Sequence, residues 1–158
     1  MKDFIILTDT RQQKEKHILK EFDKQGIIHI RTGLSSADYM ALRYNNERGF
    51  YLDYSVLIDT KKDMEEIAGN LCNVQSHERI KREIFRGKEL GAKEFIFLIN
   101  GGKIKTIDDL QKWSSKRTKV KGETLLKIFK TMSQRYDVKF VITPRAKMGE
   151  KIIELLSK

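Results

Sequence analysis

Asp59 and Lys61 are well placed to do chemistry, because they lie two positions apart at the end of an alternating stretch, residues 50–61. Apolar and more polar side chains alternate there, and a period of two predicts a β-strand with one face in a core. Both residues then project side by side from the polar face. At a cleft, the carboxylate can hold a divalent cation, and the ammonium group can orient a water or a phosphate. On a half-exposed strand the same pair is an ordinary surface ion pair, so the neighbouring motifs must decide between the two.

Two further carboxylates lie at the ends of predicted strands, and a third lies on a helix. Asp9 ends a short apolar run, Asp38 begins the strand predicted at residues 37–44, and Glu83 lies on a predicted helix. Ends of strands are where α/β sheets place ligand sites. Several carboxylates that converge with a lysine are typical of a Mg²⁺-dependent phosphodiester hydrolase, in which the metal polarises the phosphate and the lysine stabilises developing negative charge.

Strands and helices alternate along most of the chain, which predicts an α/β fold. The strands are predicted at residues 4–7, 27–30, 37–44, 50–61, 94–99 and 138–142. The helices are predicted at residues 14–25, 62–71, 76–90, 124–136 and 148–156, with Ser76 as an N-cap. Residues 94–99 are apolar almost without interruption, as expected of a central strand. The sheet is expected to be mostly parallel, with a hairpin of the third and fourth strands inserted in it.

The register of that hairpin decides whether Asp38 and Asp59 can share a cation, because both must lie on the same face. Directly opposed residues in a regular hairpin have position numbers with a constant sum, and an odd sum brings the two aspartates together. A two-residue turn at residues 48–49 and a four-residue loop at residues 46–49 both make the sum odd. An even sum would put Asp38 on the opposite face unless a bulge restored it. We predict an odd sum.

Composition indicates one soluble domain. The chain has 158 residues, of which 39% are hydrophobic and 34% charged. No apolar run approaches the roughly 20 residues that cross a bilayer, so no membrane association is expected, and the apolar run at the N-terminus is too short for a signal peptide. The single cysteine, Cys72, excludes an internal disulfide framework and fits a reducing, cytoplasmic compartment.

Positive charge is concentrated in the last third of the chain. The net charge is +10; residues 1–100 hold 17 Lys/Arg and 16 Asp/Glu, whereas residues 101–158 hold 15 and 6. The densest part is a basic loop at residues 112–121, which contains no acid. Such asymmetry indicates a polyanionic partner, nucleic acid first and an acidic membrane second, with a solvated basic surface as the alternative.

Four motifs together resemble those of the XPF-family nuclease domain, part of the PD-(D/E)XK restriction-endonuclease-like superfamily. The family order is D-x-R-E, G-D-Y, E-R-K-x-x-x-D and R-F-x-x-E/Q. Here Thr-Asp-Thr-Arg-Gln stands at residues 8–12, Gly-Leu-Ser-Ser-Ala-Asp-Tyr at 33–39, Ile-Asp-Thr-Lys at 58–61 and Arg-Ile-Lys-Arg-Glu at 79–83. The resemblance continues through residues 121–125 and covers nearly the whole chain.

The resemblance implies a restriction-endonuclease-like mixed central sheet with helices on both faces. It implies a metal-dependent DNA endonuclease that cuts branched or flapped DNA, such as flaps, forks or junctions. Small stand-alone members resemble phage- and prophage-encoded nucleases, so a bacterial or phage-infected cell is expected, with the protein in the cytoplasm at the nucleoid. A homodimer is an oligomeric state to test.

Four residues depart from the family pattern. Gln12 stands for a glutamate, Ala37 for a glycine, Asp59 for a glutamate and Thr60 for an arginine. Aspartate keeps the charge of glutamate but shortens its reach, and loss of the arginine removes a bidentate phosphate contact. The family's tandem helix-hairpin-helix module is absent from these residues, so DNA affinity is expected to come from the domain itself, with the basic loop as the natural candidate.

The resemblance assigns a role to each candidate residue. Asp38 and Asp59 are expected to hold Mg²⁺ or Mn²⁺, with Asp9 as a further ligand, directly or through water. Lys61 is expected to assist the nucleophile or the transition state, and Arg11 to contact a phosphate. The remaining DNA contacts are expected at Lys116, Arg117, Lys119 and Lys121.

Some alternatives stay open at this point. Glu65 or Glu66 stands where the family has its final aspartate, and either of them or Glu83 could join the site. A first rival function is a catalytically inactive XPF-like DNA-binding module, against which the retained acid–lysine pattern argues. A second rival is a small-molecule α/β enzyme or a regulatory domain of flavodoxin-like architecture, which no glycine-rich phosphate loop supports.

Overall fold

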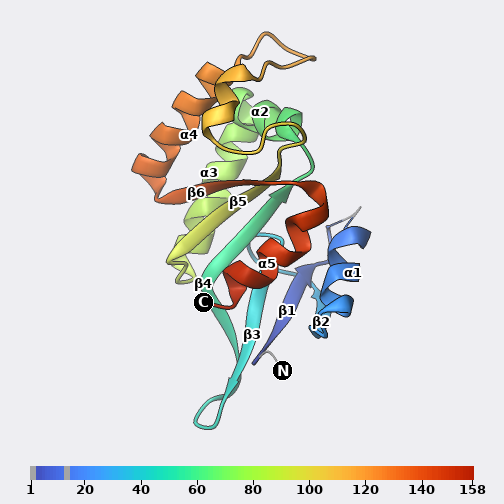
Figure 1. Ribbon diagram of the computed structural model, residues 1–158. Helices are drawn as coiled ribbons and strands as arrows, with labels where there is room; N and C mark the ends of the chain where they lie inside the picture. The colour runs from blue at the N-terminus through green and yellow to red at the C-terminus, as the bar shows by residue number, and fades with distance from the viewer. Residues whose placement is uncertain (1–2, 13–14) are drawn as a thin grey trace.

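A mixed sheet of six strands forms the centre of the computed structural model, which describes residues 3–12 and 15–158 (Figure 1). The strand order is β2-β1-β3-β4-β5-β6. The strands are β1 (Phe4–Asp9), β2 (His29–Thr32), β3 (Tyr39–Asn45), β4 (Gly49–Lys61), β5 (Glu94–Asn100) and β6 (Val138–Thr143). β3 is antiparallel to β1 and β4, and the other neighbouring pairs are parallel. The predicted mixed α/β sheet is therefore confirmed.

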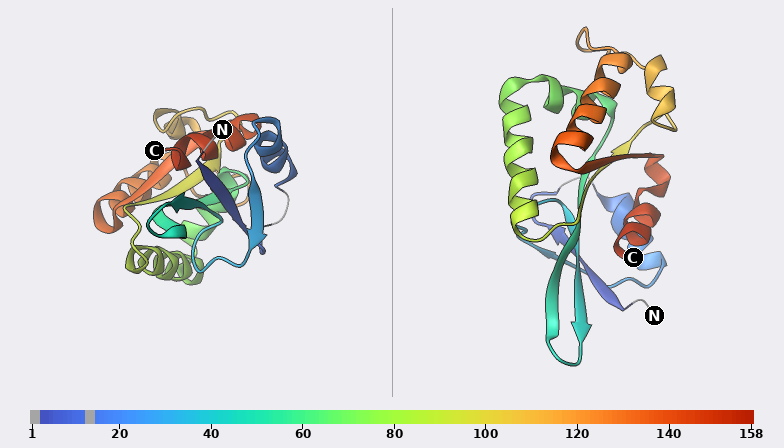
Figure 2. Two further views of the ribbon diagram at one scale, coloured as in Figure 1. Left: turned by 90° about the horizontal axis from the view of Figure 1, so that it is seen from below. Right: turned by 90° about the vertical axis from the view of Figure 1, so that its left-hand side faces the viewer.

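Helices cover both faces of the sheet, as predicted (Figure 2). On one face lie α2 (Met64–Cys72), α3 (Val74–Glu89) and α4 (Gly122–Tyr136), and on the other lie α1 (Lys16–Lys24) and α5 (Met148–Leu156). Two short 3₁₀ helices, η1 (Asp108–Lys112) and η2 (Arg145–Lys147), precede α4 and α5. Among the described residues, no helix is long and apolar enough to cross a membrane.

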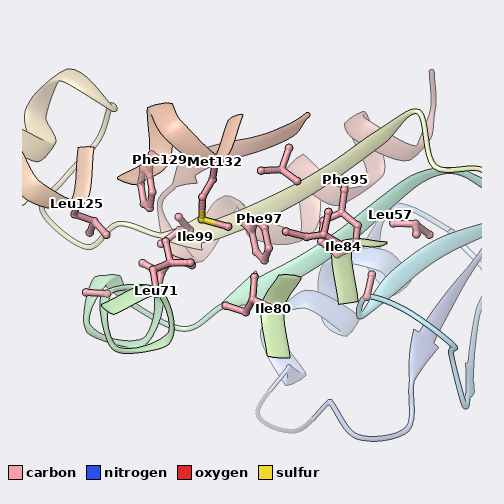
Figure 3. Packing of buried hydrophobic residues seen from close by; sticks show 14 of the residues in the cluster. Leu57, Leu71, Ile80, Ile84, Phe95, Phe97, Ile99, Leu125, Phe129 and Met132 are labelled. Atoms are coloured by element: carbon pink, nitrogen blue, oxygen red, sulfur yellow. The ribbon is translucent and has the colours of Figure 1, made fainter. Parts of the chain in front are cut away.

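Strand β5 is buried on both sides, as its apolar run predicts. Phe95 and Phe97 face the cluster under α2, α3 and α4 (Figure 3), and Ile96 and Leu98 face the cluster under α1 and α5. Each such side chain stabilises the fold by about 1.5–3 kcal/mol on burial. The two faces of β5 therefore hold both helical layers against one sheet.

The start of α3 differs from the prediction. Ser76 was expected to cap this helix, but the side chain of Asn73 accepts a hydrogen bond from Ser76 N at 3.0 Å. Asn73 is the N-cap, and the helix begins at Val74. Asparagine is as good an N-cap as serine, so the sequence pattern is compatible with a helix start at either residue.

The turn between β3 and β4 also differs from both predicted turns. Asn45 pairs with Gly49, so three residues, 46–48, form the loop. Gly49 has a φ of 69°, in the left-handed region that favours glycine. Tyr44 then pairs with Phe50, and this half of the hairpin has an even sum. The predicted odd register is wrong here.

A β-bulge corrects the register before the strands end. Ala41 pairs with Asp53 but Tyr39 pairs with Ile58, so Met40 alone faces the four residues 54–57 of β4. The three extra residues change the parity of the pairing, which turns the remaining part of β4 over relative to β3. Asp38 N donates to Ile58 O at 2.9 Å, and Asp38 and Asp59 follow as neighbours on one face.

Candidate active site

A cleft of about 690 Å³ opens on the sheet face covered by α3. β1 and β4 are both antiparallel to β3, so their carboxyl ends meet at this edge of the sheet. The four residues expected to be catalytic all line the cleft, together with Arg11: they are Asp9, Asp38, Asp59 and Lys61. The far wall is formed by α3, including Glu83.

Asp38 and Asp59 are held close together in partial isolation from water. Burial, and then the nearby charge of Asp59, raise the pKa of Asp38 well above its usual range. Thr60 opposes this shift, because its N and Oγ1 donate to Asp38 Oδ2 at 2.8 and 3.1 Å. The pair is thus fixed in place while its charges repel.

Lys61 lies beside this pair. Its Nζ is 3.1 Å from Asp59 Oδ2, and the two side chains are only 11% and 7% exposed. Burial lowers the pKa of Lys61, but attraction to Asp59 outweighs it, so the pKa is raised and the amine stays protonated. The two groups are not aligned for a hydrogen bond, and Asp59 Oδ2 is a buried oxygen that accepts none from the described residues.

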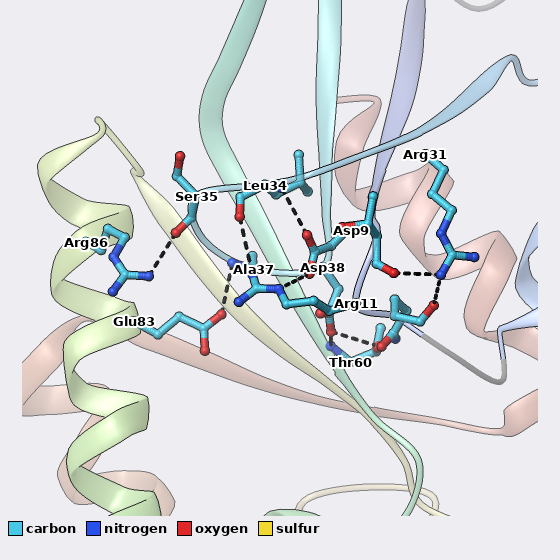
Figure 4. A network of polar contacts seen from close by, with 12 residues as sticks. Asp9, Arg11, Arg31, Leu34, Ser35, Ala37, Asp38, Thr60, Glu83 and Arg86 are labelled. Carbon is cyan, nitrogen blue, oxygen red and sulfur yellow. Dashed lines mark hydrogen bonds and ion pairs between the residues drawn. The ribbon is translucent and has the colours of Figure 1, made fainter.

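Asp9 is engaged differently (Figure 4). Its Oδ2 accepts from Arg11 Nε at 2.7 Å and its Oδ1 from Leu34 N at 3.0 Å. Arg11 also donates to Leu34 O at 3.2 Å, and its side chain is 70% exposed. Asp9 therefore ties the end of β1 to the loop before β3 and holds Arg11 at the mouth of the cleft.

Glu83 is the one acid of the three left open that lines the cleft. Its Oε1 accepts from Ala37 N at 3.0 Å, and burial and the charge of Asp59 raise its pKa. Ala37 has a φ of 65°, a left-handed conformation that is costly for residues other than glycine, and strain of this kind clusters at functional sites. Glu83 thus anchors the strained turn that presents Asp38.

Two departures from the family pattern contact each other. Gln12 Nε2 donates to Thr60 Oγ1 at 2.5 Å, and Thr60 Oγ1 donates onward to Asp38. Thr60 lacks the phosphate contact of the family's arginine, but with Gln12 it supports the aspartate instead. In the sequence, the only sign of this contact is that both residues depart from the family motifs. The fold is needed to show that the two side chains touch.

The donor set fits a divalent cation held by two carboxylates. Among residues 3–12 and 15–158, no three His, Cys, Asp or Glu side chains form a ready metal cluster. Mg²⁺ commonly binds through one or two carboxylates and keeps several waters, so Asp38 and Asp59 suffice for such a site. Asp59 Oδ2 accepts no hydrogen bond from the described residues despite its ion pair with Lys61, and Asp38 lies close to the charge of Asp59; a cation would relieve both features.

The basic loop does not line the cleft. It closes on itself through a bridge between Ser114 and Lys121, and Figure 1 shows it at the top of the molecule. Glu65 of α2 holds it: Oε2 accepts from Ser115 Oγ at 2.7 Å and Oε1 from Lys116 N at 2.6 Å. The four basic residues of the loop that are expected to bind DNA are all exposed: Lys116, Arg117, Lys119 and Lys121.

Three arginines of α3 that sequence reasoning did not assign line the cleft: Arg79, Arg82 and Arg86. Their spacing of three and four residues was visible in the sequence, and it places them on one helical face. The sequence alone does not show which face of the helix meets the cleft.

Comparison with known proteins identifies one family. The model of the ERCC4 domain matches residues 8–156. XPF from Aeropyrum pernix has a similar structure, with a TM-score of 0.67, 12% identity, and coverage of 96% of this chain and 64% of that one. XPF from Aeropyrum pernix in a complex with DNA has a TM-score of 0.67 and 14% identity, with coverage of 97% of this chain and 63% of that one. This chain thus spans less than two thirds of those chains, and at such identities the likeness shows the fold. No curated protein matches the sequence.

Proposed function

Because this chain belongs to the ERCC4 domain family, we propose that it is a divalent-metal-dependent DNA endonuclease whose site is formed by Asp38, Asp59 and Lys61. The observation that carries the proposal is the placement of a buried carboxylate, Asp59, and a partly buried one, Asp38, beside a protonated lysine in an open cleft. Asp38 and Asp59 would hold Mg²⁺ or Mn²⁺. When bound, such an ion polarises a phosphodiester and lowers the pKa of a coordinated water.

The chain's own residues supply the rest of the chemistry. Protonated Lys61 donates toward the negative charge that develops on the phosphate. Arg11 is exposed at the mouth of the cleft and contacts a neighbouring phosphate. Asp9 directs Arg11 through Oδ2 and would join the cation's ligands directly or through a water.

The substrate proposed is branched or flapped DNA, on the strength of the family and of a structural neighbour solved with DNA. Residues 1–158 would act as one nuclease domain, in the cytoplasm at the nucleoid. A homodimer also stays a prediction, and sedimentation equilibrium would test it.

Cleavage is tested with end-labelled single-stranded, duplex, flap, fork and four-way DNA in MgCl₂, MnCl₂ or EDTA. Asp59→Asn and Lys61→Met are expected to lower the cleavage rate at least about 100-fold, because the first removes a carboxylate that would hold the cation and the second removes positive charge aimed at the reacting phosphate. Circular dichroism and DNA binding in EDTA should stay near wild type. Lys62→Met, an exposed neighbour with the same charge, serves as the control.

Three outcomes would contradict the proposal. Cleavage that persists in EDTA would show that the reaction needs no divalent metal. A Lys61→Met protein with the wild-type rate would show that Lys61 takes no part in the reaction. Tight DNA binding without cleavage of any substrate would favour the inactive binding module instead.

A further inference from the structure

Helix α3 presents a row of arginines to the cleft. Arg79, Arg82 and Arg86 are exposed, and all three line the same cavity as the catalytic residues. The row lies on the helical face that also carries Glu83, which reaches across to Ala37. The row and the candidate catalytic residues therefore occupy opposite walls of one cleft.

These arginines have no acid to neutralise them. Within the described part of the chain, none of Arg79, Arg82 and Arg86 forms an ion pair with a carboxylate, and Arg86 donates only to a backbone oxygen, Ser35 O, at 3.1 Å (Figure 4). The four acids in the cleft are engaged with other groups: Asp9 with Arg11, Asp38 with Thr60, Asp59 with Lys61, and Glu83 with a backbone N–H. Unneutralised guanidinium groups in a cleft favour a bound polyanion.

Two other cations of α3 provide an internal contrast. Lys81 pairs with Glu78 at 3.2 Å, and Lys88 pairs with Asp137 at 3.3 Å. Neither lysine lines the cleft. The helix thus carries neutralised cations outside the cleft and free ones inside it, which general solubility does not explain.

The spacing of the row suits one strand of DNA. A helix rises about 1.5 Å per residue, so Arg79 and Arg86 lie about 10.5 Å apart along the axis. Phosphates of one strand advance ~3.4 Å per step along the duplex axis and lie farther apart along the strand itself, so a row of this length reaches more than one phosphate. We propose that α3 lies along the backbone of the strand to be cut, with Arg79, Arg82 and Arg86 on phosphates next to the scissile one. This inference rests on the proposed function of the cleft.

The test is DNA binding in EDTA as a function of KCl, followed by the anisotropy of a fluorescein-labelled flap substrate. Arg82→Gln/Arg86→Gln should flatten the log–log salt dependence by about 1.8, at about 0.9 per lost duplex contact. The control is Lys81→Gln/Lys88→Gln, which removes the same charge from the same helix and should keep the wild-type slope. Single methylphosphonates near the scissile bond should weaken binding by the wild type but not by the arginine variant.

The outcomes separate this inference from the proposed function. The phosphate-contact role of the arginine row is overturned, even if cleavage is normal, by either of two results. One is a wild-type salt slope in the arginine variant, and the other is equal flattening of that slope in the lysine variant. Flattening confined to the arginine variant supports the row even if no substrate is cut, in which case only the catalytic proposal fails. A wild type that does not bind DNA overturns both.

Discussion

At the scale of single residues, the ionised form of Asp38 is destabilised by its position in the folded protein. Two carboxylates share a partly dry site, and burial together with the charge of Asp59 raises the pKa of Asp38. Thr60 fixes the side chain with two hydrogen bonds and so prevents it from turning away. Functional sites often keep such unfavourable arrangements at the expense of stability.

Asp38→Asn is therefore expected to stabilise the metal-free protein at neutral pH. Because the pKa of Asp38 is higher in the folded than in the unfolded state, the folded state binds more protons between those two values, and the free energy of unfolding falls as pH rises above about 4. At pH 7.5 the substitution should raise that free energy by about 0.5–2 kcal/mol, and the gain should vanish below about pH 4.

Urea unfolding in EDTA at several pH values measures this effect, with the exposed Asp3→Asn as the control. A less stable Asp38→Asn protein at pH 7.5 would mean that the hydrogen bonds from Thr60 outweigh the repulsion.

At the scale of elements, the β3–β4 hairpin contains two registers, and the bulge between them is supported by Asp53. Its Oδ1 accepts from Ser55 N at 3.0 Å and its Oδ2 from Arg43 Nε at 2.5 Å. Arg43 also donates to Leu156 O at 2.6 Å, which ties the bulge to the end of α5. The part of β4 that carries Asp59 thus depends on a carboxylate six residues earlier.

Asp53→Ala is expected to lower the free energy of unfolding by about 1–2 kcal/mol, because it leaves the partly buried donors of Arg43 and Ser55 without their acceptor. Cleavage should fall as well, because a shifted register turns Asp59 away from Asp38. Asp53→Asn should lose less, since an amide oxygen can still accept from Ser55. Glu47→Ala, at the exposed tip of the hairpin, is the control.

The stabilisation by Asp53 also has a defined pH dependence. Burial raises the pKa of Asp53, but hydrogen bonds from Ser55 and the Arg43 ion pair outweigh it, so the pKa is lowered. This contribution is present above about pH 4 and is lost as pH falls. Full cleavage by a destabilised Asp53→Ala protein would show that the bulge keeps its register without the carboxylate.

At the scale of the whole molecule, local patterns could be predicted and distant contacts could not. The alternation of β4 and the apolar run of β5 identify both strands, because each depends on neighbouring residues. The register of β3 was hidden, since Met40 and Ala41 are both buried although they face opposite sides. Glu65 had the pattern of a solvated helix residue, because its partner Ser115 lies far along the chain.

The molecule has two separate positive surfaces: the arginine row inside the cleft and the basic loop beyond α2 and α4 (Figure 1). If the proposed function holds, the first surface suits the strand to be cut, and the second suits a more distant arm of a branched substrate. The loop is ordered by Glu65, an acid placed among basic residues. Its carboxylate accepts a hydrogen bond from Ser115 and another from the Lys116 backbone, and these lower its pKa.

Removing Glu65 sets two physical effects against each other. Loss of a negative charge beside the loop would by itself strengthen DNA binding. Loss of the two hydrogen bonds frees the loop, so the entropy cost of ordering it would then weaken DNA binding. We expect ordering to dominate, so Glu65→Ala should weaken flap binding roughly two- to tenfold at constant salt. Glu123→Ala removes an acid from the first turn of α4 without freeing the loop and should leave binding unchanged or tighter. Anisotropy titrations of both variants decide the matter, and tighter binding by Glu65→Ala would show that the loop acts through charge alone.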